Sequence, residues 1–218
     1  MKLYSGPLSL FTAKVRIALA EKGVDYERVE VGWTLADRYV PHHPDVVRLN
    51  PKREVPILED GALVVCDSTV ILEYLEERFP KPPLYPSGVA DRARCRQLEA
   101  AADEILFRSV WDVIEESLYP ESAAGRDAQR LADAKARFAV HYAATNTRLA
   151  GRDFLVDAFS VADIGTFIML NTAVTLGVAH DPGLSDLAGW LARLAERPAI
   201  ANELGEMQEF LAESLGGT

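Results

Sequence analysis

A cluster of four prolines divides the sequence into two parts with different hydrophobic periodicities. Pro80, Pro82, Pro83 and Pro86 form a stiff connection, because proline restricts the backbone to few conformations. Before the cluster, short apolar runs alternate with helical patterns, whereas from Val89 onward only helical periods occur. The sequence therefore predicts an α/β domain over residues 1–79, a proline-rich linker over 80–88 and an all-helical domain over 89–218.

The first 79 residues predict a mixed β-sheet. A strand at 2–4, a helix ending at Gly23 and a strand at 26–31 form a β-α-β unit, and Thr34 with Asp37 resembles a capping box for a short helix ending near Arg48. Two apolar runs at 55–58 and 62–65 then form a hairpin, followed by a helix over 67–78. Parallel strands need a crossover helix and antiparallel strands a tight turn, so this β-α-β-α-β-β-α order indicates a mixed sheet.

The later residues predict a bundle of helices. Leu98, Ala102 and Ile105 run along one long helix that ends at Tyr119-Pro120. The helix after Ser160 is apolar nearly all round, which is typical of the centre of a bundle. The inner face of the last helix, which begins at Pro198, holds Ile200, Leu204, Met207 and Leu211.

Charge and cysteine content exclude several functions. A formal net charge of -10 argues against direct binding of nucleic acid, which requires clustered basic residues. The two cysteines, Cys66 and Cys95, show neither disulfide nor metal-binding spacing, which fits a reducing cytoplasm. Residues 1–7 lack the apolar core of a secretory signal, and the apolar run 164–170 is too short to span a bilayer. We therefore expect a cytoplasmic protein without a metal or a membrane partner.

Val55-Pro56 is the first candidate binding element. Proline inside a strand removes a hydrogen-bond donor and belongs at an edge or a special bend. A cis peptide here would leave the main chain of Val55 free to pair with an extended peptide. From the dipeptide alone, a trans edge proline of structural value is the favoured interpretation.

Asp67-Ser68 is the second candidate. At the start of a helix, a hydroxyl and free N–H groups can hold a carboxylate, and the neighbouring aspartate can pair with an ammonium group. An α-amino acid offers both charges. An ordinary helix N-cap is the simpler interpretation of this pair taken alone.

Ser9 is the third candidate, at the turn before the first helix. A hydroxyl that donates to a bound thiolate forms a charge-assisted hydrogen bond of about 1.5–3 kcal/mol, enough to lower the thiol pKa by roughly one to two units. A thiol with a free pKa near ~8.5 would then be largely ionised at neutral pH. Capping is the structural alternative, and Ser5 and Thr12 are competing hydroxyls.

The sequence resembles the glutathione transferase superfamily over nearly its whole length. The motifs that carry the resemblance are Val15 to Leu19, Leu49-Asn50-Pro51, Val55-Pro56, Asp67-Ser68, Tyr74-Leu75 and Phe159 to Asp163. The resemblance implies a thioredoxin-like N-terminal domain that binds glutathione as co-substrate, followed by an all-helical domain. It also implies a homodimer.

The resemblance implies a role for each matching residue. Val55 and the cis Pro56 would hold the cysteinyl part of glutathione, and Asp67 and Ser68 its γ-glutamyl end. A gap-free alignment from Arg16 puts Ser9 at the thiol-activating position. Lys52 and Arg53 would lie near the glycyl carboxylate, and an apolar electrophile would bind near Phe11, Phe107 and Trp111. Ser160 and Asp163 match a structural capping box.

A second resemblance leaves the activity open. Residues 5–7, 15–24 and 74–84 are similar to the stringent starvation protein A family, whose members bind RNA polymerase and are not known as transferases. Ser9 favours an enzyme that conjugates glutathione to hydrophobic electrophiles. One alternative is a non-catalytic interaction protein, and another is a glutathione-dependent isomerase or dehalogenase. Phe11 stands here in place of the second cysteine-type nucleophile of the dehalogenases.

Overall fold

The computed structural model describes residues 1–40, 42–119 and 127–216. They form two compact units, which we call the α/β unit (Met1–Pro83 with Arg197–Thr218) and the helical unit (Leu84–Glu196). The domain boundaries at 79, 88 and 218 stay a prediction, since the units are defined by packing alone. The two packing units differ from the predicted domains at the last helix, because this helix packs with the α/β unit.

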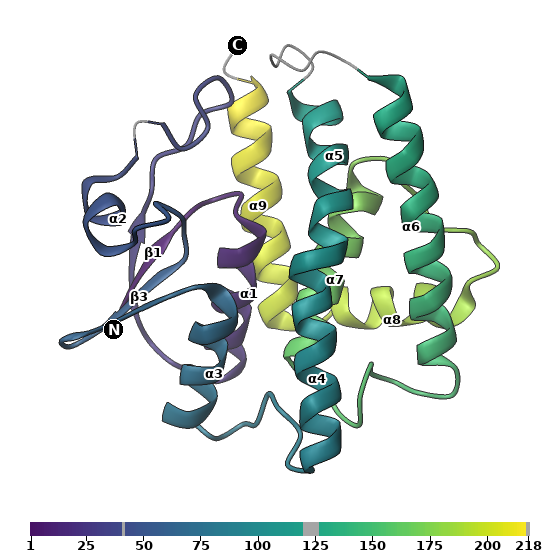
Figure 1. Ribbon diagram of the computed structural model, residues 1–218, viewed down its shortest axis with the longest axis horizontal. Coiled ribbons are helices and arrows are strands. Elements are labelled where there is room, and N and C mark those ends of the chain that lie inside the picture. Colours follow the sequence, from purple (N-terminus) through teal and green to yellow (C-terminus); the bar gives the residue numbers. More distant parts are fainter. Residues whose placement is uncertain (41, 120–126, 217–218) are drawn as a thin grey trace. The chain divides into compact units, whose positions relative to one another are not determined.

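A four-stranded mixed sheet forms the centre of the α/β unit, as predicted (Figure 1). Its strands are β1 (Lys2–Ser5), β2 (Glu27–Glu30), β3 (Ile57–Asp60) and β4 (Leu63–Cys66). The order is β2-β1-β3-β4. β1 is parallel to β2 and antiparallel to β3, and β3 is antiparallel to β4, so the crossover helix and the hairpin connect the strands as their lengths require.

Helices cover both faces of this sheet because side chains alternate along its strands. Leu3 and Leu58 face α1 (Leu10–Glu21) and α3 (Ser68–Arg78), and pack with apolar residues of both helices. Tyr4 and Ile57 face the opposite way and pack with Val46 of α2 (Pro44–Leu49). This is the thioredoxin-like arrangement that the resemblance implied.

The predicted helix after Thr34 is shorter than expected. α2 begins at Pro44, where the ring nitrogen of His43 accepts from the N–H of Asp45 at 3.2 Å. Thr34 and Asp37 close a turn instead, with the N–H of Asp37 2.9 Å from the threonine hydroxyl. The Thr-x-x-Asp pattern therefore marked a turn, since the same hydrogen bond serves both structures.

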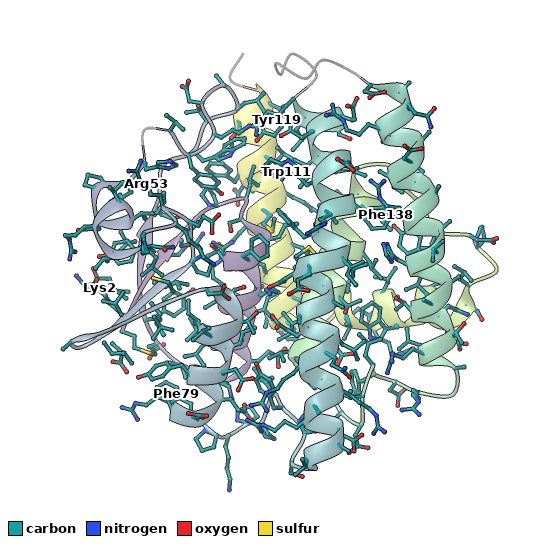
Figure 2. All side chains as sticks on the ribbon, viewed as in Figure 1. Lys2, Arg53, Phe79, Trp111, Tyr119 and Phe138 are labelled. Carbon is teal, nitrogen blue, oxygen red and sulfur yellow. The ribbon has the colours of Figure 1, made fainter. Side chains whose placement is uncertain are left out.

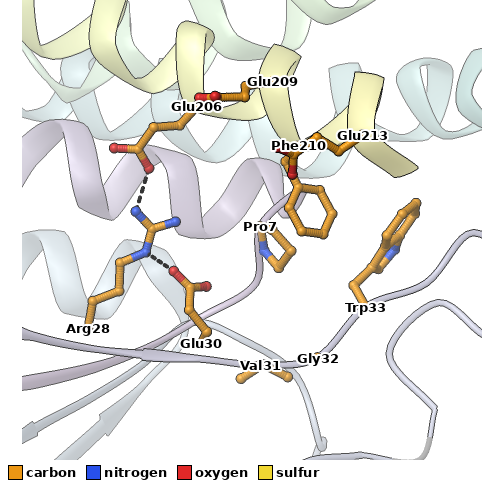
Figure 3. Close-up of a pocket in the computed structure, with 10 residues that line it drawn as sticks. All are labelled: Pro7, Arg28, Glu30, Val31, Gly32, Trp33, Glu206, Glu209, Phe210 and Glu213. Carbon is orange, nitrogen blue, oxygen red and sulfur yellow. Dashed lines mark hydrogen bonds and ion pairs between the residues drawn. The ribbon is translucent and has the colours of Figure 1, made fainter. Parts of the chain in front are cut away.

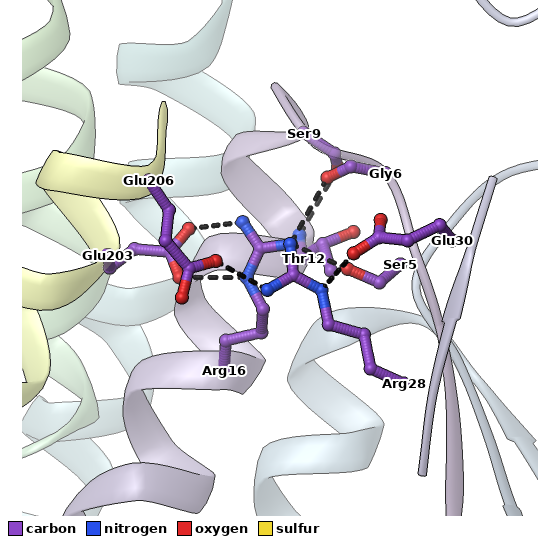
Figure 4. A network of polar contacts seen from close by, with 9 residues as sticks. All are labelled: Ser5, Gly6, Ser9, Thr12, Arg16, Arg28, Glu30, Glu203 and Glu206. Atoms are coloured by element: carbon purple, nitrogen blue, oxygen red, sulfur yellow. Dashed lines mark hydrogen bonds and ion pairs between the residues drawn. The ribbon is translucent and has the colours of Figure 1, made fainter. Parts of the chain in front are cut away.

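Two arginines connect the α/β unit's last helix, α9 (Pro198–Gly216), to its other elements. Arg28 of β2 forms ion pairs with Glu206 and Glu30 at partly exposed positions (Figure 3). Arg16 of α1 lies deeper and forms a two-pronged contact with Glu203, both side chains being 4% exposed (Figure 4). The Arg16 guanidinium also donates to the hydroxyl of Ser5 and the carbonyl of Gly6. It therefore connects α9 with the loop that carries Ser9.

The linker is anchored at its first residues. The ammonium group of Lys22, at the end of α1, contacts the carboxylate of Glu76 at 2.7 Å. It also donates to the carbonyls of Phe79 and Pro82 at 2.8 and 2.9 Å. These three oxygens accept hydrogen bonds from the ammonium group, which explains why Lys22 can be buried.

The helical unit consists of α4 (Val89–Ala101), a π-helical turn (Ala102–Leu106), α5 (Phe107–Leu118), α6 (Ala128–Leu149), α7 (Val161–Thr175) and α8 (Ser185–Ala195). α7 is buried almost throughout, as predicted. Phe138 of α6 is labelled in Figure 2. Its ring packs on Tyr142 with centroids 5.5 Å apart. At the π turn, Ile105 is 54% exposed and the next residue, Leu106, is buried. Over the described ranges, no helix carries an apolar run that would cross a bilayer.

Candidate functional site

The three candidate elements come together at one end of the sheet. Tyr4 pairs with Ile57, and Ile57 pairs with Cys66. Continuing these two ladders by one residue puts Pro56 between Ser5 and Asp67. The loop after β1, the entry to β3 and the exit from β4 therefore lie side by side in the α/β unit, although the sequence separates them widely.

Two helices start at this end of the sheet. Ser9 is the N-cap of α1, and Asp67 is the N-cap of α3. Helix N-termini carry partial positive charge and free N–H groups, which favour bound anions. The end of the sheet is therefore suited to a ligand with carboxylate or thiolate groups.

Ser9 is the candidate hydroxyl with access to a ligand. Its side chain is half-buried, and its oxygen accepts from the N–H of Thr12 at 3.2 Å. Because capping uses the oxygen as an acceptor, the hydroxyl proton stays available for donation to a second group. Capping and thiolate binding are thus compatible roles for this serine.

The two competing hydroxyls are inaccessible. Ser5 and Thr12 are both 0% exposed. The Ser5 oxygen lies 2.5 Å from the Arg16 guanidinium, which fixes its orientation. A ligand at the end of the sheet could reach neither side chain without movement of the backbone.

The Val55-Pro56 peptide is cis, as the resemblance implied, so the trans interpretation of the dipeptide was wrong. Val55 is half-buried and lies two residues before the first residue of β3. The main chain of Val55 is therefore not part of the hydrogen-bonded pairing between β3 and β1, which begins at Ile57.

Asn50 organises the loop that leads to Val55, a role that the sequence analysis missed. Its side chain is 3% exposed, donates to the carbonyl of Glu54 at 2.8 Å and accepts from the N–H of Lys52 at 3.0 Å. An asparagine before proline could have signalled such a turn, because its side chain bonds readily to the backbone two residues on.

The cations of this loop lie at its exposed side. Arg53 is on the loop between α2 and β3 (Figure 2), and the Lys52 ammonium lies 3.6 Å from the Asp67 carboxylate. Both groups of this pair are largely exposed, so the contact contributes little to stability and leaves them available to a ligand.

Two candidate residues have unusual backbone conformations. Arg53 has φ 58° and Asp67 has φ 78°, a region that side chains other than glycine rarely adopt. Such conformations persist where the surrounding structure imposes them, and they cluster at ligand sites. Asp67 uses one carboxylate oxygen to cap Thr69 at 3.1 Å, while Ser68 is 4% exposed.

Cys66 adjoins these residues without the properties of a reactive thiol. It is half-buried, and its sulfur lies 3.6 Å from the carbonyl of Leu49. Burial raises the pKa of the Cys66 thiol, against the opposing effect of Lys52. The protein's own thiol is therefore protonated at neutral pH, and any thiolate at this end of the sheet has to come from a ligand.

The residues predicted for an electrophile pocket belong to different units. Phe11 of α1, in the α/β unit, lies under the ammonium group of Lys14, which is 5.5 Å from the ring centroid. Phe107 and Trp111 of α5, in the helical unit, are neighbours with centroids 5.8 Å apart, and Trp111 is 40% exposed. Their common function stays a prediction.

Comparison with known proteins establishes the family. Residues 3–83 match the model described as glutathione S-transferase, N-terminal domain. The chain is 32% identical over 209 residues to a stringent starvation protein A homologue from Pasteurella multocida, which covers 94% of this chain and 90% of that protein. The chain belongs to the glutathione transferase superfamily.

Other members of the superfamily are similar in sequence or in structure. Glutathione S-transferase Z1 of Arabidopsis thaliana is 43% identical over 93 residues, which span 41% of that protein. Alignments with further relatives of at least 40% identity span 40–57% of those proteins. The theta class glutathione S-transferase from Xanthomonas axonopodis pv. citri, solved with glutathione bound, has a TM-score of 0.81 and 27% identity, with 93% of this chain and 95% of that one covered.

The described residues of the protein do not form a recognisable metal site. Within those residues, no three His, Cys, Asp or Glu side chains are grouped as a metal site would need. His43 caps α2 and packs edge-on against Tyr4, with ring centroids 5.9 Å apart.

Replacing Asn50 with alanine is expected to lower the free energy of unfolding by about 1–3 kcal/mol, because two hydrogen bonds of about 0.5–1.5 kcal/mol each are lost from a buried position. Urea unfolding followed by circular dichroism measures the effect. The exposed Asn202→Ala variant serves as a control and should change stability by less than about 0.5 kcal/mol. Equal effects of the two substitutions would show that Asn50 does not hold the loop.

Proposed function

We propose that this protein is a glutathione transferase-like enzyme, which conjugates the glutathione thiolate to a hydrophobic electrophile. Val55, Asp67 and Ser68 bind the tripeptide, with Pro56 fixing the main chain and Lys52 and Arg53 near the glycyl carboxylate. Ser9 stabilises the thiolate. We expect a cytoplasmic homodimer.

The reaction needs few groups from the protein. The thiol proton passes to solvent, and the sulfur then forms a bond to an electrophilic carbon. Where that carbon carries a leaving group, the group departs with its bonding electrons. The protein accelerates the step by lowering the thiol pKa and by holding the reactants together.

The half-buried Ser9 hydroxyl, at a helix N-terminus beside the entry to β3, is the observation that carries this proposal. The oxygen accepts the capping bond and the proton is left for the sulfur. The raised pKa of Cys66 favours a mechanism in which the reactive sulfur belongs to glutathione. The glutathione bound to the Xanthomonas relative gives further support for glutathione as the ligand.

Replacing Ser9 with alanine tests the catalytic assignment. Loss of a charge-assisted bond of about 1.5–3 kcal/mol should lower kcat/KM for conjugation roughly 10- to 150-fold. The pKa of enzyme-bound glutathione, followed by the ultraviolet absorbance of its thiolate, should rise by about one to two units in the same variant. Calorimetric affinity for glutathione at pH 7 should fall less than the rate.

Two variants control this experiment. Ser9→Thr keeps both the cap and the hydroxyl, and should retain most of the activity. Thr12→Val removes the buried hydroxyl three residues away and should leave the bound thiol pKa unchanged. The catalytic assignment is wrong if Ser9→Ala conjugates as fast as the unchanged protein, or if Thr12→Val has the larger effect.

A second candidate function is a non-catalytic interaction protein of the stringent starvation protein A type, which binds RNA polymerase. Its support is the 32% identity to such a homologue along 94% of the chain. This function predicts co-purification with RNA polymerase and no calorimetric signal with glutathione. A glutathione-dependent isomerase or dehalogenase would share the first site and differ in its second substrate.

A further inference from the structure

A cavity of about 500 Å³ opens in the α/β unit, between α9 and residues 28–33 of β2 and the segment after it (Figure 3). Pro7, two residues before Ser9, forms part of its wall, and the other lining residues come from 28–33 and from 206–213. The volume is sufficient for a small organic molecule. None of the residues assigned above to glutathione lines it.

One wall of the cavity is aromatic. The rings of Trp33 and Phe210 meet edge to face, with centroids 5.7 Å apart and an angle of 63° between their planes. Both side chains are half-buried, and Figure 3 shows Phe210 between Pro7 and Trp33. An apolar ligand body would bury surface against these rings. The π face of tryptophan also attracts cations.

The lining is also acidic. Glu206, Glu209 and Glu213 lie on one face of α9, because helical residues three and four positions apart are neighbours. Glu30 completes the set. Four carboxylates thus face one guanidinium, that of Arg28, and this group is already held by Glu206 and Glu30. The lining therefore has three negative charges in excess, with Glu209 and Glu213 nearest the aromatic pair in sequence.

We propose that this cavity binds an organic cation: an ammonium or guanidinium group carried on an aromatic or branched aliphatic body. The body packs on Trp33 and Phe210, and the cationic group faces Glu209 and Glu213. Carboxylates at the cavity wall stabilise a cation and repel an anion of the same shape, whereas the rings accept either. The acidic wall thus determines the charge of the ligand. The proposal holds whether or not the protein conjugates glutathione.

Three ligands that share a phenyl group test the proposal: phenethylammonium, 2-phenylethanol and phenylacetate. Isothermal titration calorimetry on the full chain without glutathione should give the order cation, neutral, anion, with the cation bound about tenfold more tightly than the alcohol. Trp33→Leu should weaken binding of both the cation and the alcohol. No measurable binding of phenethylammonium at millimolar concentration, or equal affinity for the cation and the alcohol, would overturn the proposal.

A pair of double variants separates the cavity charges from the overall charge. Glu209→Gln with Glu213→Gln should bring the cation and the alcohol to within about threefold of each other. Glu77→Gln with Asp157→Asn removes two charges at exposed positions outside the cavity and should keep the tenfold preference. If the first variant retains the preference, the cation binds elsewhere and the assignment to this cavity is wrong.

Discussion

Replacing Arg16 with methionine should lower the free energy of unfolding of the α/β unit by about 3–5 kcal/mol, the usual cost of leaving one member of a buried ion pair alone. The Glu203 carboxylate would lose its partner at a position that is 4% exposed. Ser5 and the carbonyl of Gly6 would lose the donor that orders the loop before Ser9. Urea unfolding and hydrogen exchange of the α9 amides measure the change.

The chain offers a matched control for this substitution. Arg28 and Glu206 make the same kind of contact between β2 and α9, with side chains 28% and 53% exposed. Arg28→Met should therefore cost at most about 1 kcal/mol. Combining Arg16→Met with Glu203→Leu should cost less than Arg16→Met alone, because no charge is then left buried. Equal losses for Arg16→Met and Arg28→Met would refute the argument from burial.

Replacing Asp163 with alanine is expected to destabilise the helical unit by a similar amount, about 3–5 kcal/mol, because buried donors lose their common acceptor. The carboxylate accepts from the N–H groups of Leu155 and Ser160 at 2.9 and 3.0 Å and from the Ser160 hydroxyl at 3.1 Å. The indole of Trp190 also donates to it, at 3.1 Å. Asp163 is 0% exposed, so water cannot replace it.

Thermal unfolding of Asp163→Ala, monitored through tryptophan fluorescence, measures this effect, since Trp190 reports on the lost contact. Asp157→Ala changes an exposed aspartate of the same loop and should shift stability by less than about 0.5 kcal/mol. A normal unfolding midpoint for Asp163→Ala would mean that the capping box does not hold α7. The family resemblance implied this box, and the structure has both of its hydrogen bonds.

The sequence predicted the sheet and most helices because their signals are local. The hairpin at Gly61, the crossover helix and the capping box each depend on residues close together in the chain. The sequence also identified Ser9, Val55 and Asp67 as candidates, and the strand ladders explain why they converge. Their chemical roles stay predictions.

What the sequence could not predict depends on distant pairs. Hydrophobic periodicity expected Leu204 and Met207 to face inward on the last helix, but Glu203 is the more deeply buried residue, since Arg16 neutralises it. Local hydrophobic periodicity assigns every glutamate to the solvated surface, so it cannot identify one that is buried. The π turn at 102–106 could not be predicted for a related reason. It follows from packing, and its amino-acid composition does not differ from that of an ordinary helix.

The packing of α9 into the α/β unit has a consequence for how the chain folds during synthesis. Residues 1–83 leave the ribosome well before residues 197–216, and until then Arg16 has no carboxylate to meet it from that helix. The packing of residues 1–83 is thus completed by a helix that is translated later. A nascent chain halted at residue 196 should expose the α1 surface that α9 covers, and should be cut there by a protease that spares the full-length protein.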